Sequence, residues 1–108
     1  MRKAKVIYKD EEAGILTQFD DGSFSFRYLD AWLQDVHKSA ISLTFPKTKS
    51  TFHSKVLFPF FFHMLPEGSN KQVICAHHRL DSDDHFGLLL KSAYNDTIGA
   101  VRILKVDA

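Results

Sequence analysis

An alternating run directly after an Asp-Gly turn is the feature that most constrains this fold. Asp21-Gly22 suits a tight hairpin turn, because such turns need positive φ angles. The next residues, Ser23–Tyr28, alternate polar and aromatic side chains, which predicts a strand whose Phe and Tyr rings face a core. Together with the apolar segments before the turn, this pattern predicts an antiparallel meander. Its three strands are expected at Lys3–Lys9, Ile15–Asp20 and Ser23–Tyr28.

Two more segments carry strand patterns, at opposite ends of the chain. Ala40–Phe45 alternates again and stops before Pro46, so it predicts a fourth strand. Ile98–Val106 predicts a closing strand that joins the meander. Between these two segments, the Ser-, Thr- and Lys-rich Lys47–Lys55 is expected to be a polar loop.

Start signals and apolar spacing predict three short helices in the second half. Pro59 suits the first position of a helix, Ser69 is a plausible N-cap, and Ser82 or Asp83 can cap a third helix. A short turn or helical piece is also expected at Leu29–Val36. The three helices are expected at Phe60–Leu65, from Ser69 to about Leu80, and at His85–Lys91. The predicted fold class is α+β: a small antiparallel sheet, made of the meander and the C-terminal strand, with three short helices packed on it.

Bulk properties favour one soluble domain, 1–108. The 108 residues include 44% apolar and 25% charged side chains, the usual balance of a globular fold. The net charge is only +1 and no dense basic block is present, which disfavours direct binding of nucleic acid. The longest apolar run, Val56–Phe62, is too short to span a membrane. The single cysteine, Cys75, favours a reducing, cytoplasmic location.

The six histidines and the cysteine form no recognisable catalytic or metal-binding motif. His77 and His78 are adjacent, so on a helix they point about 100° apart and cannot share one ligand face. Asp81–Asp84 lacks the central Gly and distal Glu of a calcium loop, and Cys75 lies among apolar neighbours. We therefore expect no catalytic residue, no metal site and no cofactor. A small metal- or thiol-dependent enzyme is the less favoured alternative.

Phe58–Gly68 is the most distinctive stretch of the chain. It holds four Phe and one Met within a short predicted helix and its end. One helical turn cannot bury all of these side chains on a single side. Part of this apolar surface must therefore meet either the sheet or a partner protein.

Several segments, in this order along the chain, resemble the N-terminal subdomain of HipA-type bacterial kinases. Gly14–Leu16 is similar to a G-x-L strand start, and Ile41–Pro46 resembles an I-S-L-S-L-P strand. Phe58–Gly68 resembles the signature P-F-F-x-x-L-L-P-E-G. Asp84–Leu89 and Asp96–Val101 are similar to D-x-F-G-L-L and D-x-x-G-A-V. The resemblance extends from about residue 6 to residue 105.

The resemblance implies a protein-binding role without catalysis. HipA-type proteins are Ser/Thr kinases that act as toxins in bacterial toxin–antitoxin modules, and their catalytic residues lie in later domains. In some modules the N-terminal subdomain is a separate protein, HipS, that binds and inhibits a shortened kinase, HipT, beside a DNA-binding protein, HipB. We therefore expect a HipS-like antitoxin that binds a HipT-like kinase, with a HipB-like protein in a ternary complex. A non-inhibitory scaffold and a fragment of a full-length kinase are the alternatives.

The expected partner-binding residues are the aromatic anchors, the loop behind them and the start of the last predicted helix. Aromatic side chains often dominate the binding energy of such interfaces. In this sequence the candidates are Phe60, Phe61, Met64, Pro66, Glu67, Gly68, Ser69, Asn70, Asp84, His85 and Phe86.

Overall fold

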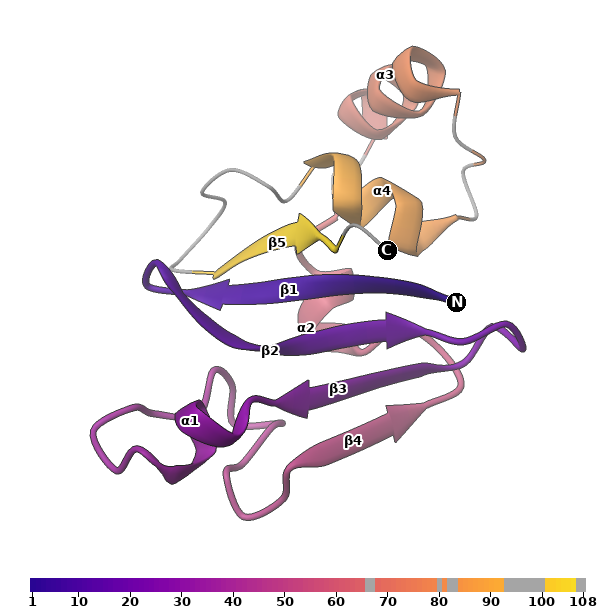
Figure 1. Cartoon of the computed structure of the whole chain (residues 1–108). Helices are drawn as coiled ribbons and strands as arrows, with labels where there is room; N and C mark the ends of the chain where they lie inside the picture. The colour runs from indigo at the N-terminus through magenta and orange to yellow at the C-terminus, as the bar shows by residue number, and fades with distance from the viewer. Residues whose placement is uncertain (66–67, 80, 82–83, 93–100, 107–108) are drawn as a thin grey trace.

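The computed structural model describes residues 1–65, 68–79, 81, 84–92 and 101–106. Five strands form one antiparallel sheet in the order β4-β3-β2-β1-β5 (Figure 1). The strands are β1 (Arg2–Tyr8), β2 (Glu11–Gln18), β3 (Phe24–Tyr28), β4 (Thr51–Ser54) and β5 (Val101–Lys105). The helices are α1 (Asp30–Gln34), α2 (Pro59–Phe62), α3 (Gly68–His78) and α4 (His85–Ser92). The α+β class is therefore confirmed. The C-terminal strand joins the meander as predicted, and the structure places it beside β1 at Val101–Lys105.

The helices occupy different positions around the sheet. In Figure 1, α2 lies behind the sheet, α4 lies beside β5, and α3 lies beyond α4. The short α1 lies at the opposite end of the sheet from the β2–β3 hairpin (Figure 1). One sheet face is thus covered by α2, and α3 packs on α4.

The two turns of the meander were not predicted equally well. The Asp21-Gly22 turn is present, and its glycine has a φ of 88°. The first turn is tighter than predicted, because only Lys9 and Asp10 connect β1 to β2, with φ angles of 50° and 67°. Such a two-residue turn matches the twist of the flanking strands, so β2 begins at Glu11 instead of Ile15.

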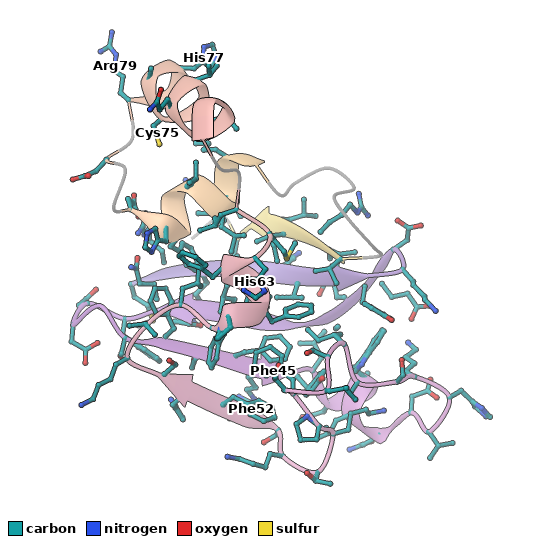
Figure 2. The ribbon with its side chains drawn as sticks, turned by 180° about the vertical axis from the view of Figure 1, so that it is seen from behind. Phe45, Phe52, His63, Cys75, His77 and Arg79 are labelled. Carbon is teal, nitrogen blue, oxygen red and sulfur yellow. The ribbon has the colours of Figure 1, made fainter. Side chains whose placement is uncertain are left out.

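An aromatic core fills the space between the sheet and α2. Phe26 of β3 is fully buried, and its ring centroid lies 4.8 Å from that of Phe45 and 5.8 Å from that of Phe61. Phe52 of β4 lies beside Phe45 (Figure 2). Its ring centroid is 6.5 Å from that of Phe26. Tilted and stacked rings at these separations are favourable beyond the area they bury. Packing in the core therefore accounts for these four of the ten Phe residues.

Gly14 lies directly against the aromatic core, and its lack of a side chain leaves room for the Phe26 ring. The two residues are on adjacent strands, where Gly14 pairs with Tyr28. A Cβ atom on Gly14 would lie 2.7 Å from the Phe26 ring and closer still to the backbone oxygen of Arg27. The position therefore excludes any side chain, which accounts for the glycine in the G-x-L segment.

The predicted fourth strand at Ala40–Phe45 is wrong, and the predicted loop at Lys47–Lys55 is correct over 47–50 but wrong over Thr51–Ser54. The structure describes bends and a turn over 41–45, whereas Thr51–Ser54 forms β4 and pairs with β3. A strand would place Ile41, Leu43 and Phe45 on one face. Instead the ends of this segment are buried while Leu43 is 99% exposed.

The buried hydroxyl group of Tyr28 holds the ends of this loop together. It donates a hydrogen bond to the carbonyl oxygen of Phe45 at 2.5 Å and accepts one from the N–H of Ile41 at 3.1 Å. Burial raises the pKa of the Tyr28 hydroxyl above its ordinary value. A side chain of the sheet thus satisfies the backbone groups that a ladder would otherwise pair.

The helix starts agree with the sequence in part. Pro59 is the first residue of α2, as predicted, but α3 begins at Gly68, one residue before the proposed cap Ser69. Ser82 and Asp83 lie outside the described residues, and the N-cap of α4 is Asp84. Its carboxylate accepts a hydrogen bond from the N–H of Gly87 at 3.1 Å, the usual reach of a cap to the third helical residue.

Candidate protein-docking surface

A hollow of about 520 Å³ lies where three segments meet, and we call it the hairpin groove. The segments are the β2–β3 hairpin, the stretch from β4 into α2, and the first residue of α4. The lining residues are Gln18, Gly22, Phe24, Lys55, Val56, Leu57, Pro59, Phe62, His63 and His85.

The groove has a buried apolar floor and an exposed apolar rim. Phe24 and Leu57 are buried, whereas Phe62 is 45% exposed and Val56 is 67% exposed. The rings of Phe62 and His85 meet edge to face at 5.2 Å, so α2 and α4 touch here. Exposed apolar side chains beside a concave surface are typical of protein-binding sites.

An ion pair fixes the α4 side of the groove to the first residue of β1. Arg2 of β1 donates hydrogen bonds to both carboxylate oxygens of Asp84, at 3.0 and 2.6 Å, and it also bonds Gln18. The guanidinium of Arg2 lies 5.1 Å from the centre of the Phe86 ring. A fork of this kind fixes orientation as well as distance, so α4 is held in register with β1.

Gly87 makes room for this ion pair. A Cβ atom there would lie 2.9 Å from the carboxylate carbon of Asp84. A side chain at position 87 would occupy the space of the Asp84 carboxylate, which both caps α4 and pairs with Arg2. The role of Asp84 therefore requires a glycine at position 87.

The hydrogen bond from Arg2 holds the pKa of Asp84 below its ordinary value, and the N–H of Gly87 acts in the same direction. A lowered pKa means that the folded state favours the carboxylate. The stabilisation that the Asp84 carboxylate gives the folded state is therefore complete above its pKa in the unfolded chain, about 3.9. This stabilisation is lost as the pH falls through the lower pKa of the folded state. We expect the free energy of unfolding to decline below about pH 4 and Asp84→Asn to flatten that decline.

Two substitutions separate the cap from the ion pair at neutral pH. Asparagine is as good an N-cap as aspartate, so Asp84→Asn removes mainly the charge, whereas Asp84→Ala also removes the cap and should cost about 1 kcal/mol more. Urea unfolding between pH 3 and pH 7 measures both effects. The pKa of Asp21 is also lowered, by hydrogen bonds from Ser23, so part of the acid slope should remain in the Asp84 variants. An unchanged slope in Asp84→Asn would contradict the assignment.

The structure places the predicted partner-binding residues in three different settings. Phe61 and Phe86 are fully buried in the core, so neither offers surface to a partner, and the prediction is corrected for both. Phe60 and Met64 are partly buried against the core. Asp84 and His85 lie at the start of α4, and His85 lines the groove.

The predicted loop residues lie at the limit of the described chain. Pro66 and Glu67 lie outside the described residues. Gly68, Ser69 and Asn70 are the first residues of α3, and only their backbone is described. A binding role for these residues stays a prediction.

The sequence reasoning missed the groove itself, including Phe62, Val56 and Lys55. One signal was available: Pro59 opens α2, and consecutive residues of a helix point about 100° apart, so Phe61 and Phe62 cannot share a face. With Phe61 in the core, Phe62 must point elsewhere. The contribution of the β2–β3 hairpin is a tertiary contact that no local pattern reveals.

The described residues supply no evident metal centre. Among them, no three His, Cys, Asp or Glu side chains gather closely enough to hold an ion. Cys75 is buried in α3 as a free thiol. In the described ranges, no helix has the length and apolar character that crossing a membrane requires.

Comparison with known proteins gives one consistent result over the whole chain. The model of the HipA N-terminal domain matches residues 4–104. A solved structure of the N-terminal domain of HipA toxin is 32% identical, with a TM-score of 0.73 over 99% of this chain and 94% of that one.

Two sequence relatives carry this domain in different contexts. A Haemophilus influenzae protein of unassigned function is 38% identical over 103 residues, which cover 95% of this chain and 92% of that relative. The candidate kinase Y4mE of Sinorhizobium fredii is 30% identical over 107 residues, but this chain spans only 25% of its length. The chain therefore belongs to the HipA N-terminal domain family.

Proposed function

We propose that this chain is a HipS-type antitoxin, which binds a HipA-like Ser/Thr kinase and holds it inactive without performing catalysis itself. The observation that carries the proposal is the occurrence of one domain in two contexts. The domain makes up nearly all of the Haemophilus relative and a quarter of the candidate kinase of Sinorhizobium. A domain that belongs to a kinase chain in one protein can act on a separate kinase chain in another.

The energetics of such inhibition are within reach of a domain of this size. An inhibitor needs only to bind the inactive state better, and a difference of about 5.5 kcal/mol moves a two-state balance from 1:99 to 99:1. A standard interface buries roughly 800 Å² on each partner, and a few aromatic anchors supply most of its energy. The exposed ring of Phe62 and the partly buried Phe60 and Met64 are the available anchors near α2.

Co-expression with a HipA-like kinase of the same genome tests the proposal. We expect this chain to co-purify with the kinase and to relieve the growth arrest that the kinase causes alone. Binding without relief would indicate a scaffold, and the absence of binding would refute the proposal. Purification with the HipB-like protein present would reveal the ternary complex.

A paired substitution at the start of α3 tests the predicted loop separately. Ser69→Arg combined with Asn70→Glu places two large charged side chains there. If this segment contacts the kinase, the double variant should lose protection while its unfolding curve stays close to that of the parent. Full protection would exclude the segment from the interface.

A further inference from the structure

We propose that the hairpin groove receives a short segment of the kinase in which a bulky apolar side chain stands next to an acidic residue. This inference rests on the proposed function and names the part of the kinase that this surface recognises. Its support comes from the size, the lining and the charge of the groove.

The apolar part of the recognition follows from the shape of the groove. Its volume of about 520 Å³ lies within the range of concave sites that enclose a ligand, whereas flat protein interfaces lack such hollows. Three apolar side chains can contact an inserted side chain. Phe24 and Leu57 form the buried floor of the groove, and the exposed ring of Phe62 forms part of its rim. A protruding loop or tail can enter such a hollow, whereas a flat surface cannot.

The acidic part follows from the charges around the groove. Lys55 and His63 are exposed lining residues, and His85 completes a set of three basic side chains. No acidic side chain lines the described walls of the groove. A carboxylate brought in by the partner would find a cation and imidazole N–H donors already in place.

Three acidic residues of the described chain near the groove already have partners within it. Asp20 pairs with the N-terminal amine, and Asp84 pairs with Arg2. Asp21 accepts hydrogen bonds from the N–H and the hydroxyl of Ser23, at 2.9 and 2.6 Å. Their charges are therefore directed mainly at these partners, and Asp84 also interacts electrostatically with His85.

The same charges argue against a second copy of this chain as the occupant. A symmetric contact through the groove would bring the Lys55 ammonium groups of both copies onto one interface. Like charges placed opposite each other oppose association. An acidic segment of a different protein meets no such repulsion.

Affinity measurements with the purified kinase test the charge and the aromatic wall separately. We expect Lys55→Glu to weaken binding by about tenfold or more at low salt and to reduce the salt dependence of the affinity. Phe62→Ala should weaken binding by about tenfold at all salt concentrations. Lys3→Glu is the matched control, because Lys3 is exposed on β1 outside the groove.

A photo-crosslinker identifies the bound segment directly. With p-benzoylphenylalanine in place of Phe62, we expect a crosslink to a kinase peptide that contains Asp or Glu beside a bulky apolar residue. The same group in place of Val36, which is 89% exposed just after α1, should give none. Figure 1 shows α1 and the hairpin at opposite ends of the sheet.

The outcomes separate this inference from the proposed function. If the parent chain binds the kinase and both groove variants bind equally well, the groove assignment is wrong while the antitoxin proposal stands. A crosslink to a second copy of this chain, to the DNA-binding protein or to a kinase segment without an acidic residue would also overturn the assignment. If the parent chain binds no kinase, the proposed function is refuted and this inference is refuted with it.

Discussion

Replacing Phe26 with alanine is expected to lower the free energy of unfolding by about 3–5 kcal/mol, the range measured for removing a buried aromatic side chain. Phe26 is fully buried, and four aromatic rings lie within 6.5 Å of its ring centre. The loss includes the transfer of the ring and the cavity that remains, because neighbours on two strands and a helix cannot all move inward. Domains of this size are stable by about 5–15 kcal/mol, so this variant should approach the folding threshold.

Urea unfolding followed by fluorescence measures this effect, since Trp32 is the single tryptophan and is buried. Phe62→Ala is the matched control, because it removes the same ring from an exposed position. It should cost less than about 1 kcal/mol. Comparable losses in the two variants would mean that the aromatic core is not centred on Phe26. The small loss expected for Phe62→Ala also allows that variant to be used as a folded protein in binding measurements.

The sequence predicted the fold best where a local pattern agreed with tertiary packing. Ser23–Tyr28 alternates, and Phe24, Phe26 and Tyr28 are buried as predicted. Pro59 opens α2 because its fixed φ and missing N–H suit the first position of a helix. At these positions a residue's own preference and its place in the core coincide.

The prediction failed where distant residues determined the local structure. Ile41–Phe45 has the period of a strand, yet a hydroxyl group on β3 binds both of its ends and Leu43 points into solvent. Thr51–Ser54 reads as a polar loop, but it forms β4 because β3 offers it a free edge. Only the tertiary structure decides which of two weak segments pairs with an existing strand.

The candidate site was predicted less completely than the fold, for the same physical reason. The sequence singled out the Phe-rich segment correctly as too apolar to be buried on one side. It could not tell which ring lies inward, and so Phe61 was proposed as a contact instead of Phe62. The other walls of the groove come from the β2–β3 hairpin and from His85, which are far from α2 in sequence. A groove built from three separate segments leaves no contiguous motif.

Replacing Tyr28 with phenylalanine should lower the free energy of unfolding by about 2–4 kcal/mol, although only one oxygen atom is removed. The hydroxyl is buried and satisfies two backbone groups, the carbonyl of Phe45 and the N–H of Ile41. Phenylalanine would leave both groups without a partner in an apolar environment, and each buried unpaired group costs about 1–3 kcal/mol. Because the pKa of this hydroxyl is raised, the parent should also lose stability above about pH 10, and the variant should lose less there.

Hydrogen exchange distinguishes a local from a global effect of Tyr28→Phe. The amide of Ile41 should lose more protection than amides in β2, since its acceptor is removed while the strand ladder remains. Tyr8→Phe is the matched control: Tyr8 lies against the core, and the described residues provide no hydrogen bond to its hydroxyl, so its removal should be nearly neutral. If Tyr28→Phe were equally neutral, water or a rearranged loop would have to satisfy both backbone groups, and the 41–45 loop would not depend on the sheet for its shape.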